Sequence, residues 1–304
     1  MKRFIFNILI WGLPFWGIMC IVDYCYSKRV EKSNYCSIEQ WNDIINGNID
    51  ADIVIMGSSR AWVQINPMII DSVLSTNTYN LGTDGSNFNR QMKKYIIYRK
   101  YNKKPKLVIQ NIDFCSTLGY NVGYEKIQFC PFFWNKSIRD EFWSSEPFSF
   151  FEKYAPMYRF RNLFPSFLLS LGERSLNKGY RSVDESWNGE EFEKIDSIRF
   201  NVNSTTLNMF CEYLKKNKED SIKVVLVYAP IYIGATEKVT NLNDMYTLYQ
   251  NIANKYGATI LDYNYMDMCK DTAYFYNAMH LNKRGSEIFT DSLANDIKRL
   301  ALYH

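Results

Sequence analysis

The stretch from residue 52 to residue 60, Asp-Ile-Val-Ile-Met-Gly-Ser-Ser-Arg, constrains the fold of this chain more than any other. Its first part is apolar and rich in β-branched residues, as in a strand buried on both faces of a parallel sheet. Gly57 ends the run and permits a sharp turn. Ser58 and Ser59 then stand where a helix can begin, and backbone N–H groups there can stabilise a developing oxyanion. The same residues also fit an ordinary Gly-Ser-Ser turn.

Four further apolar runs alternate with segments of helical periodicity, which predicts an α/β fold with a doubly wound, mainly parallel five-stranded sheet. In such sheets a ligand lies beyond the carboxyl ends of the strands. The turns at Ser59, Gly85, Asn111 and His280 all fall at that edge. The predicted strands are 52–56, 76–81, 107–112, 223–229 and 258–261, and the predicted helices are 67–74, 88–101, 205–216, 244–256 and 283–300.

The sequence contains two histidines, His280 and His304. His304 is the last residue of the sequence, where we expect the chain to fray. His280 follows a turn-like segment and precedes the last predicted helix, so it is the candidate general base. A lone histidine can equally be structural.

The N-terminus carries an apolar run without charge from Phe4 to Val22, preceded by Lys2 and Arg3 and closed by Asp23. Its length suffices to cross a bilayer, which needs about 20 residues. We therefore predict an uncleaved membrane anchor over residues 1–23, with the body of the protein outside the cytoplasm. A cleaved signal peptide is the alternative and leads to the same compartment.

Three further regions follow the predicted anchor. Residues 24–50 are polar, and we expect a tether with a short helix over 38–45. The main domain is expected over 51–304, with an insertion of loops and short helices at about 114–200. This insertion is dense in Phe, Trp and Tyr, so it could be a small lobe that buries its own aromatic side chains, a lid or glycan-binding wall, or a surface resting on a membrane.

Composition argues against several classes of partner. The chain has 36 basic and 32 acidic residues, a net charge of +4, and no basic stripe with interleaved aromatic residues, so nucleic acid is not an expected partner. Seven cysteines are present without a Cys-x-x-Cys pair, so zinc is not suggested. We expect no metal and no cofactor, and the cysteine spacing leaves disulfide pairing open.

Four short motifs together resemble the SGNH (GDSL-like) hydrolase superfamily, which implies a flavodoxin-like sheet. The closest resemblance is to membrane-anchored, extracytoplasmic members that move or remove acyl groups on cell-envelope polymers. It covers roughly residues 50–115 and 220–300. The motifs are Gly57-Ser58-Ser59, Asn80 followed by Gly85, Asn111 after the third strand, and Asn277-Ala-Met-His280 continued by Leu281-Asn282 and Gly285.

The resemblance implies a role for each of these positions. Ser59 would be the nucleophile, His280 the general base, and Asn277 the residue that orients the histidine ring. The oxyanion hole would consist of the N–H groups of Ser59 and Gly85 with the side-chain amide of Asn111. Beside this site, Arg60 would bind an anionic group of the substrate or serve as a structural ion-pair partner.

Asn277 departs from the family pattern, which has an aspartate here. An aspartate would orient the histidine and stabilise its imidazolium, whereas an asparagine offers a hydrogen bond without charge. Three outcomes are open. A Ser-His dyad suffices for a slow transfer, the site has become a binding pocket, or another carboxylate substitutes, with Asp271, Asp84 and Asp113 as candidates.

The expected function is that of a serine esterase or O-acyltransferase acting on acyl groups of a cell-envelope glycan. Its expected location is the cytoplasmic membrane of a bacterium, as a single-pass protein with an extracytoplasmic domain. The expected partners are the membrane, the glycan or acylated substrate, and a membrane acyl donor. The alternative is an inactive protein that binds a polysaccharide or an assembly partner. No motif distinguishes hydrolysis from transfer.

Overall fold

The computed structural model describes residues 2–34, 36–112, 126–143, 148–161, 175–189, 197 and 199–303. Two compact units account for the chain. Residues 1–43 and 125–175 belong to the first, and residues 44–124 and 176–304 belong to the second. The candidate site lies in the second unit, so this unit is described first.

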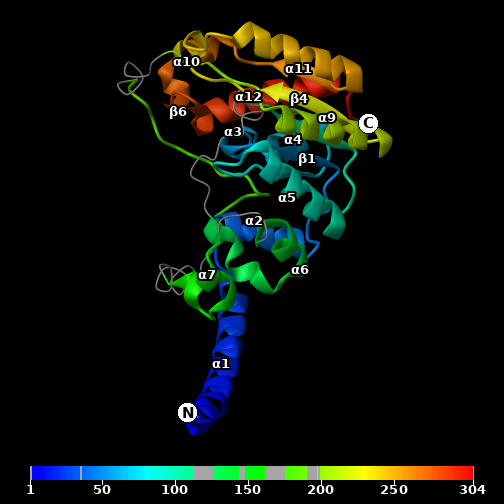
Figure 1. Cartoon of the computed structure of the whole chain (residues 1–304). Helices are drawn as coiled ribbons and strands as arrows, with labels where there is room; N and C mark the ends of the chain where they lie inside the picture. Colours follow the sequence, from blue (N-terminus) through cyan, green and yellow to red (C-terminus); the bar gives the residue numbers. More distant parts are fainter. Residues whose placement is uncertain are drawn as a thin grey trace. The chain divides into compact units, whose positions relative to one another are not determined.

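A five-stranded parallel sheet, of which Figure 1 labels β1 and β4, forms the centre of the second unit. Its strand order is β2-β1-β3-β4-β5. This is the flavodoxin-like order of a doubly wound sheet, and it confirms the predicted fold class. The strands are short and apolar because helices cover both faces, and every residue of the first three strands is buried. Their bounds are β1 (Ile53–Met56), β2 (Thr78–Asn80), β3 (Leu107–Asn111), β4 (Lys223–Tyr228) and β5 (Thr259–Asp262).

Helices pack on both faces of the sheet. On one face α12 packs against α3 and α4, and on the other α9 packs against α5 and α11. The five predicted helices are confirmed to within a few residues. The bounds are α3 (Ser59–Gln64), α4 (Pro67–Leu74), α5 (Phe88–Tyr101), α9 (Ser204–Glu219), α10 (Ile233–Glu237), α11 (Leu242–Tyr256) and α12 (Lys283–Arg299).

Asparagine caps the start of four of these helices. Each cap side chain accepts a backbone N–H from the first helical turn, which would otherwise have no partner. The four caps are Asn66 before α4, Asn87 before α5, Asn203 before α9 and Asn282 before α12. Because the caps fix where the helices begin, they also fix the loops that lead from the carboxyl ends of the strands.

Residues 176–183 run along the free edge of β2. The backbone N–H of Asn80 donates to the carbonyl of Lys178 at 2.9 Å. Gly179 makes this approach possible, because a Cβ atom there would lie 1.9 Å from the carbonyl oxygen of Asn80. Its φ of +81° is also one that a residue with a side chain rarely adopts.

Replacing Gly179 by alanine is expected to lower the free energy of unfolding by about 3 kcal/mol or more, since left-handed strain and a backbone clash add together. Gly189→Ala is the matched control. Gly189 has a φ of +86°, but its nearest neighbour to a new Cβ is a methyl group 3.7 Å away. We expect the control to cost only about 1 kcal/mol in urea unfolding. Equal costs for the two variants would contradict the close approach.

The first unit begins with α1 (Lys2–Val30), which continues well beyond residue 23, where we expected a polar tether. Asp23 explains the difference, because its buried carboxylate binds Arg159, the indole N–H of Trp134 at 3.1 Å and the backbone N–H of Met157 at 2.7 Å. These bonds attach the C-terminal part of α1 to the rest of the first unit. Among the residues that the structure describes, no helix combines the length and the apolar character needed to cross a membrane.

Between residues 126 and 161 the described part of the insertion contains short helices, and it buries many of its own aromatic side chains. Phe129 and Phe142 stack at 4.2 Å between ring centroids, and the ring of Trp41 packs against both. This burial favours the small aromatic lobe among the alternatives considered. The insertion contributes η1 (Lys126–Phe129), η2 (Pro131–Trp134), α6 (Lys136–Ile138), η3 (Arg139–Trp143), α7 (Phe150–Tyr154) and η4 (Tyr158–Phe160), and Trp41 comes from α2 (Cys36–Ile45), which precedes it in the sequence.

Candidate active site

The turn after β1 brings Ser59 against the end of β3. Gly57 has a φ of +151°, and a Cβ atom there would lie 2.6 Å from the Cβ of Ala61 and 3.0 Å from the Cβ of Asn111. A side chain at this position would therefore clash with the first turn of α3 and with β3. Ser59 is the first residue of α3, so the close packing at Gly57 sets where its hydroxyl lies.

A two-stranded hairpin carries the histidine. Strand β6 (Phe275–Asn277) pairs with β7 (His280–Leu281), and the register places Asn277 opposite His280. The side chain of Asn282 donates to the carbonyl of Ala273 while its oxygen caps α12. Gly285 lies against the hairpin, since a Cβ atom there would be 2.4 Å from the carbonyl oxygen of Tyr274. These contacts explain why Asn282 and Gly285 follow the histidine at this spacing.

Three side chains form a continuous chain of hydrogen bonds. Ser59 Oγ lies 2.8 Å from His280 Nε2, and His280 Nδ1 lies 2.9 Å from Asn277 Oδ1. The same oxygen accepts the backbone N–H of Met279 at 3.0 Å, which fixes the orientation of the amide. Nδ1 must then be the protonated nitrogen, because it faces an acceptor. Nε2 is left as the acceptor for the serine hydroxyl, as a general base requires.

The carboxylates considered as substitutes for the family aspartate lie elsewhere. Asp271 accepts the backbone N–H of Ala273 and caps the short helix η7 (Thr272–Tyr274). Asp84 is exposed, and its charge contributes, after burial, to raising the pKa of Tyr276 to about 12. Asp113 lies outside the described residues. The group that holds Nδ1 is the neutral amide of Asn277.

The predicted oxyanion residues lie at the same edge of the sheet. Asn111 ends β3, is fully buried and lies next to the turn at Gly57. Gly85 lies in the loop between β2 and α5 with a φ of +58°. The same loop is tied to the nucleophile turn, because the backbone N–H of Thr83 donates to the carbonyl of Gly57 at 3.2 Å.

Sequence reasoning missed the importance of Gly82 in this loop. A Cβ atom at Gly82 would lie 2.5 Å from the backbone nitrogen of Trp62 in α3, so only glycine lets the loop approach this closely. Asn80 adds to the contact, because its amide donates to the carbonyls of Ala61 and Ile65 and its Oδ1 accepts the N–H of Gly82. The signal is the first glycine after Asn80, whereas the resemblance points to the second, Gly85.

The prediction that Arg60 binds substrate is wrong, and the alternative structural role fits. Arg60 is 3% exposed, and its guanidinium donates to the carbonyls of Ala229 and Ile112 at 3.4 Å. It therefore ties α3 to the chain that leaves β3 and β4.

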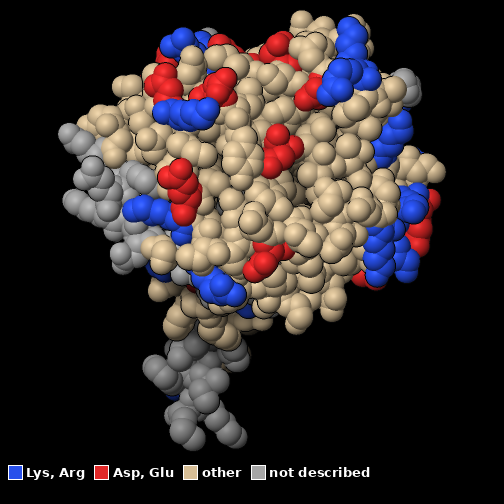
Figure 2. All heavy atoms as spheres, turned by 90° about the horizontal axis from the view of Figure 1, so that it is seen from above, with Lys and Arg blue, Asp and Glu red and all other residues tan. Residues whose placement is uncertain are grey.

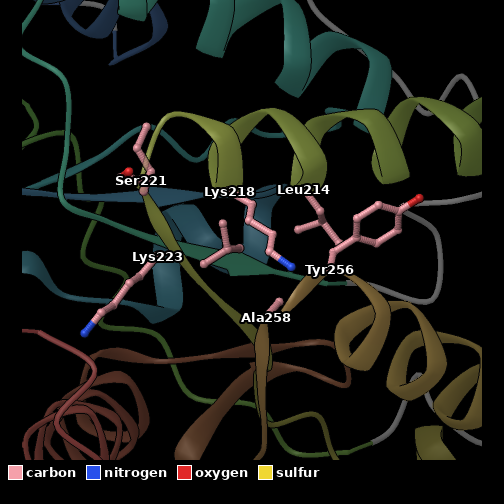
Figure 3. A pocket seen from close by; sticks show the side chains of 9 residues that line it. Leu214, Lys218, Ser221, Lys223, Tyr256 and Ala258 are labelled. Carbon is pink, nitrogen blue, oxygen red and sulfur yellow. The ribbon is translucent and has the colours of Figure 1, made fainter.

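A cavity at the opposite edge of the sheet lacks comparable chemistry. It has a volume of about 220 Å³ and lies where β4 and β5 begin, with the side chains of Lys218, Lys223 and Tyr256 in its wall (Figure 3). Lys223 Nζ donates to the carbonyl of Ala301 at 3.3 Å. No serine–histidine pair lines this cavity. Within the described residues, no cluster of His, Cys, Asp or Glu forms a metal site.

A buried lysine supports the loop that carries Gly85. Lys94 in α5 is 3% exposed, and its Nζ donates to Thr83 Oγ1 at 2.6 Å. Burial lowers the pKa of Lys94 to about 7. In the unfolded chain the pKa of a lysine has its ordinary value of about 10.4. At pH values between the two pKa values, the unfolded state therefore binds more protons than the folded state.

We therefore expect the free energy of unfolding to rise with pH from about 7 to 10, by up to about 1.4 kcal/mol per pH unit. Lys94→Met removes the titrating group and should flatten this rise in urea titrations at pH 6.5 and 8.5. Lys100→Met, at an exposed position of the same helix, is the control and should leave the slope unchanged. An unchanged slope in Lys94→Met would show that other groups set the pH dependence.

Charges on the molecular surface show no preference for one kind of partner. On the face seen from above, acidic and basic side chains are scattered and separated by uncharged surface (Figure 2). This distribution agrees with the small net charge of the chain.

Comparison with known proteins returns distant structural likenesses. No family model and no curated protein matches the sequence. Solved structures that match include a candidate platelet activating factor from Streptococcus pneumonia, at 11% identity and a TM-score of 0.44, covering 93% of this chain and 98% of that one. A candidate lipolytic protein of the G-D-S-L family from Desulfitobacterium hafniense matches at 11% identity and a TM-score of 0.39. The match covers 81% of this chain and 99% of that one.

A GDSL-like lipase from Bacteroides thetaiotaomicron also matches, at 13% identity and a TM-score of 0.39, covering 82% of this chain and 88% of that one. At these identities and TM-scores the likenesses say nothing about activity. The function is therefore argued from the residues of the site.

Proposed function

We propose that the protein is a serine esterase or O-acyltransferase with Ser59 as its nucleophile. One observation carries the proposal: the hydrogen-bonded chain from Ser59 through His280 to Asn277, with 2.8 and 2.9 Å between successive polar atoms. A serine that donates to a histidine whose other nitrogen is held by a third side chain is the arrangement that activates a hydroxyl nucleophile.

The proposed reaction has two stages. Ser59 Oγ attacks the carbonyl carbon of an ester while its proton passes to His280 Nε2, and the carbonyl oxygen becomes an oxyanion. The N–H groups of Ser59 and Gly85 and the amide of Asn111 stabilise that charge. The bond to the leaving oxygen then breaks, and Nε2 returns the proton to it. In the second stage His280 Nε2 takes a proton from water or an acceptor hydroxyl, whose oxygen attacks the acyl carbon. The bond from that carbon to Ser59 Oγ then breaks, Nε2 returns its proton to Oγ, and the acyl group leaves on the attacking oxygen.

The neutral partner of the histidine predicts a slow enzyme. Asn277 orients the ring, but it adds no negative charge to stabilise the imidazolium that forms in each stage. Transfer to an acceptor held in place tolerates a slow chemical step better than scavenging hydrolysis does. The proposed substrate is an acylated glycan of the bacterial cell envelope, with a membrane acyl donor as a partner in the case of transfer.

The proposed location is the extracytoplasmic side of the cytoplasmic membrane, with α1 as the anchor. Large apolar side chains of α1 are exposed, which is costly in water and favourable in lipid. The helix changes character at Asp23, whose carboxylate is buried within its own unit. The exposed fractions are 61% for Phe6, 76% for Trp11, 66% for Phe15, 58% for Ile18 and 64% for Ile21.

The second candidate function is an inactive protein that binds a polysaccharide or an assembly partner, and Asn277 is the observation that favours it. Labelling with a fluorophosphonate separates the two. An activated Ser59 should be labelled stoichiometrically, with the adduct found by mass spectrometry on the peptide that contains Ser59. Ser58→Ala serves as the control and should still be labelled. No labelling of the folded protein would favour the inactive alternative.

A further inference from the structure

The backbone around Arg181 is fixed to the elements that carry the candidate site. The N–H of Arg181 donates to the carbonyl of Trp62 in α3 at 3.2 Å. Two residues later, the carbonyl of Val183 accepts the N–H of Lys283 at the start of α12 at 2.7 Å. The segment is thus held both by the helix that begins at Ser59 and by the helix that follows His280.

The side chain of Arg181 is exposed but held in place. Its guanidinium lies over the ring of Trp62, 5.2 Å from the ring centroid. Trp62 follows Ser59 by three positions in α3, so the two residues lie on the same side of that helix. A cation–π contact with the face of the guanidinium leaves its N–H edge available for hydrogen bonds.

The charge of Arg181 also acts on the other side of the site. Tyr276 stacks on His280, with 5.3 Å between ring centroids. Burial and the charges of Asp84 and Glu185 raise the pKa of Tyr276, whereas the charge of Arg181 lowers it. The charge of Arg181 therefore acts on the tyrosine that stacks on His280. Among the described residues, neither Asp84 nor Glu185 nor any other carboxylate forms an ion pair with Arg181.

We propose that Arg181 determines substrate specificity by binding an anionic group, a carboxylate or phosphate, of an ester bound at Ser59. The inference deepens the proposed esterase function and rests on it. It also supplies the anion-binding residue that sequence reasoning had placed at Arg60. An arginine held on a tryptophan presents two parallel N–H groups, which suit the two oxygens of such an anion.

The test compares anionic esters with neutral ones. Mono-4-nitrophenyl succinate carries its carboxylate on the acyl side, and 4-acetoxybenzoate carries it on the alcohol side. Their neutral counterparts are 4-nitrophenyl butyrate and methyl 4-acetoxybenzoate. Arg181→Gln should raise KM for one of the anionic esters about 10- to 100-fold, the range of a lost charge-assisted hydrogen bond. The neutral esters should change by no more than about twofold, and Arg181→Lys should retain part of the preference.

Two further variants check the electrostatic argument. Lys255→Gln removes the same charge from a cation that lies over an aromatic ring, Tyr256, at the opposite edge of the sheet, and should have no effect. Glu185→Gln removes a negative charge near Tyr276 and should lower KM for the anionic ester severalfold. Equal changes for anionic and neutral esters in Arg181→Gln, or no change, would overturn the proposal while leaving the esterase function intact.

The proposal remains testable if the protein hydrolyses none of these esters, an outcome that would count against the proposed function instead. Binding of mono-4-nitrophenyl succinate and 4-acetoxybenzoate is then measured by calorimetry with Ser59→Ala and with the double variant Ser59→Ala/Arg181→Gln. Arg181 is supported if one anionic ester binds at least tenfold more weakly to the double variant. If both anionic esters bind equally well to the two variants, or bind to neither variant, the assignment of Arg181 as the anion-binding residue is overturned.

Discussion

Ser59→Ala is expected to lower kcat for ester hydrolysis by about 10⁴-fold or more. The hydroxyl of Ser59 is the atom that attacks the carbonyl carbon, and it lies 2.8 Å from His280 Nε2, the nitrogen that takes its proton. Removing the nucleophile of such a site leaves only what the oxyanion groups and substrate binding contribute. Initial rates on 4-nitrophenyl acetate measure the effect.

Ser58→Ala is the matched control for this variant. Ser58 precedes α3, and its side chain does not cap the helix, so its loss should change kcat by no more than a few-fold. The thermal unfolding temperature of both variants should stay near that of the parent protein. Undiminished hydrolysis by a folded Ser59→Ala protein would remove Ser59 from the mechanism.

Asn277→Asp is expected to raise kcat by about 10- to 100-fold. A carboxylate at this position would keep the hydrogen bond to His280 Nδ1 and would also stabilise the imidazolium that forms as Ser59 attacks. The gain is smaller than the 10⁴-fold cost of the reverse change in a serine protease triad. Here the bond from Met279 N–H already holds Oδ1 toward the ring, so the parent site has the correct tautomer.

The pH dependence of kcat gives this prediction a second readout. Because a carboxylate favours the charged imidazole, the acid limb of the profile should move to higher pH by about one unit. The gain in kcat should therefore be largest at pH values above the shifted acid limb. Asn277→Ala, which removes both charge and orientation, should lower kcat about 100-fold. An Asn277→Asp protein with unchanged rate and unchanged limb would show that the histidine is not the base.

Strands β1, β3 and β4 could be predicted from sequence because they are buried almost throughout. Each appears as a mainly apolar run that stops at a glycine, a proline or a polar residue, as at Met56 before Gly57. The pairing of Asn277 with His280 was implied by the resemblance of this motif, whereas the hairpin that carries both residues was not predicted. The short motifs did not indicate which polar side chains are buried.

Burial of Arg60 depends on carbonyl groups from two distant parts of the chain, Ile112 and Ala229. No local pattern around Arg60 indicates that these carbonyls converge on it. The continuation of α1 beyond Asp23 depends in the same way on Arg159, which is 136 residues away in the sequence. The aromatic insertion has no period that separates an inward face from an outward face, so its packing could not be predicted.

The most direct test of the central claim is to trap the acyl-enzyme. The protein is mixed with 4-nitrophenyl acetate, quenched in acid within the first turnover and analysed by peptide mass spectrometry. We expect one acetyl group on Ser59, absent from Ser59→Ala and longer-lived in His280→Ala where any acylation occurs. An acetyl group on another residue that turns over at the rate of hydrolysis, or steady hydrolysis with Ser59 never modified, would contradict the assignment of Ser59 as the nucleophile.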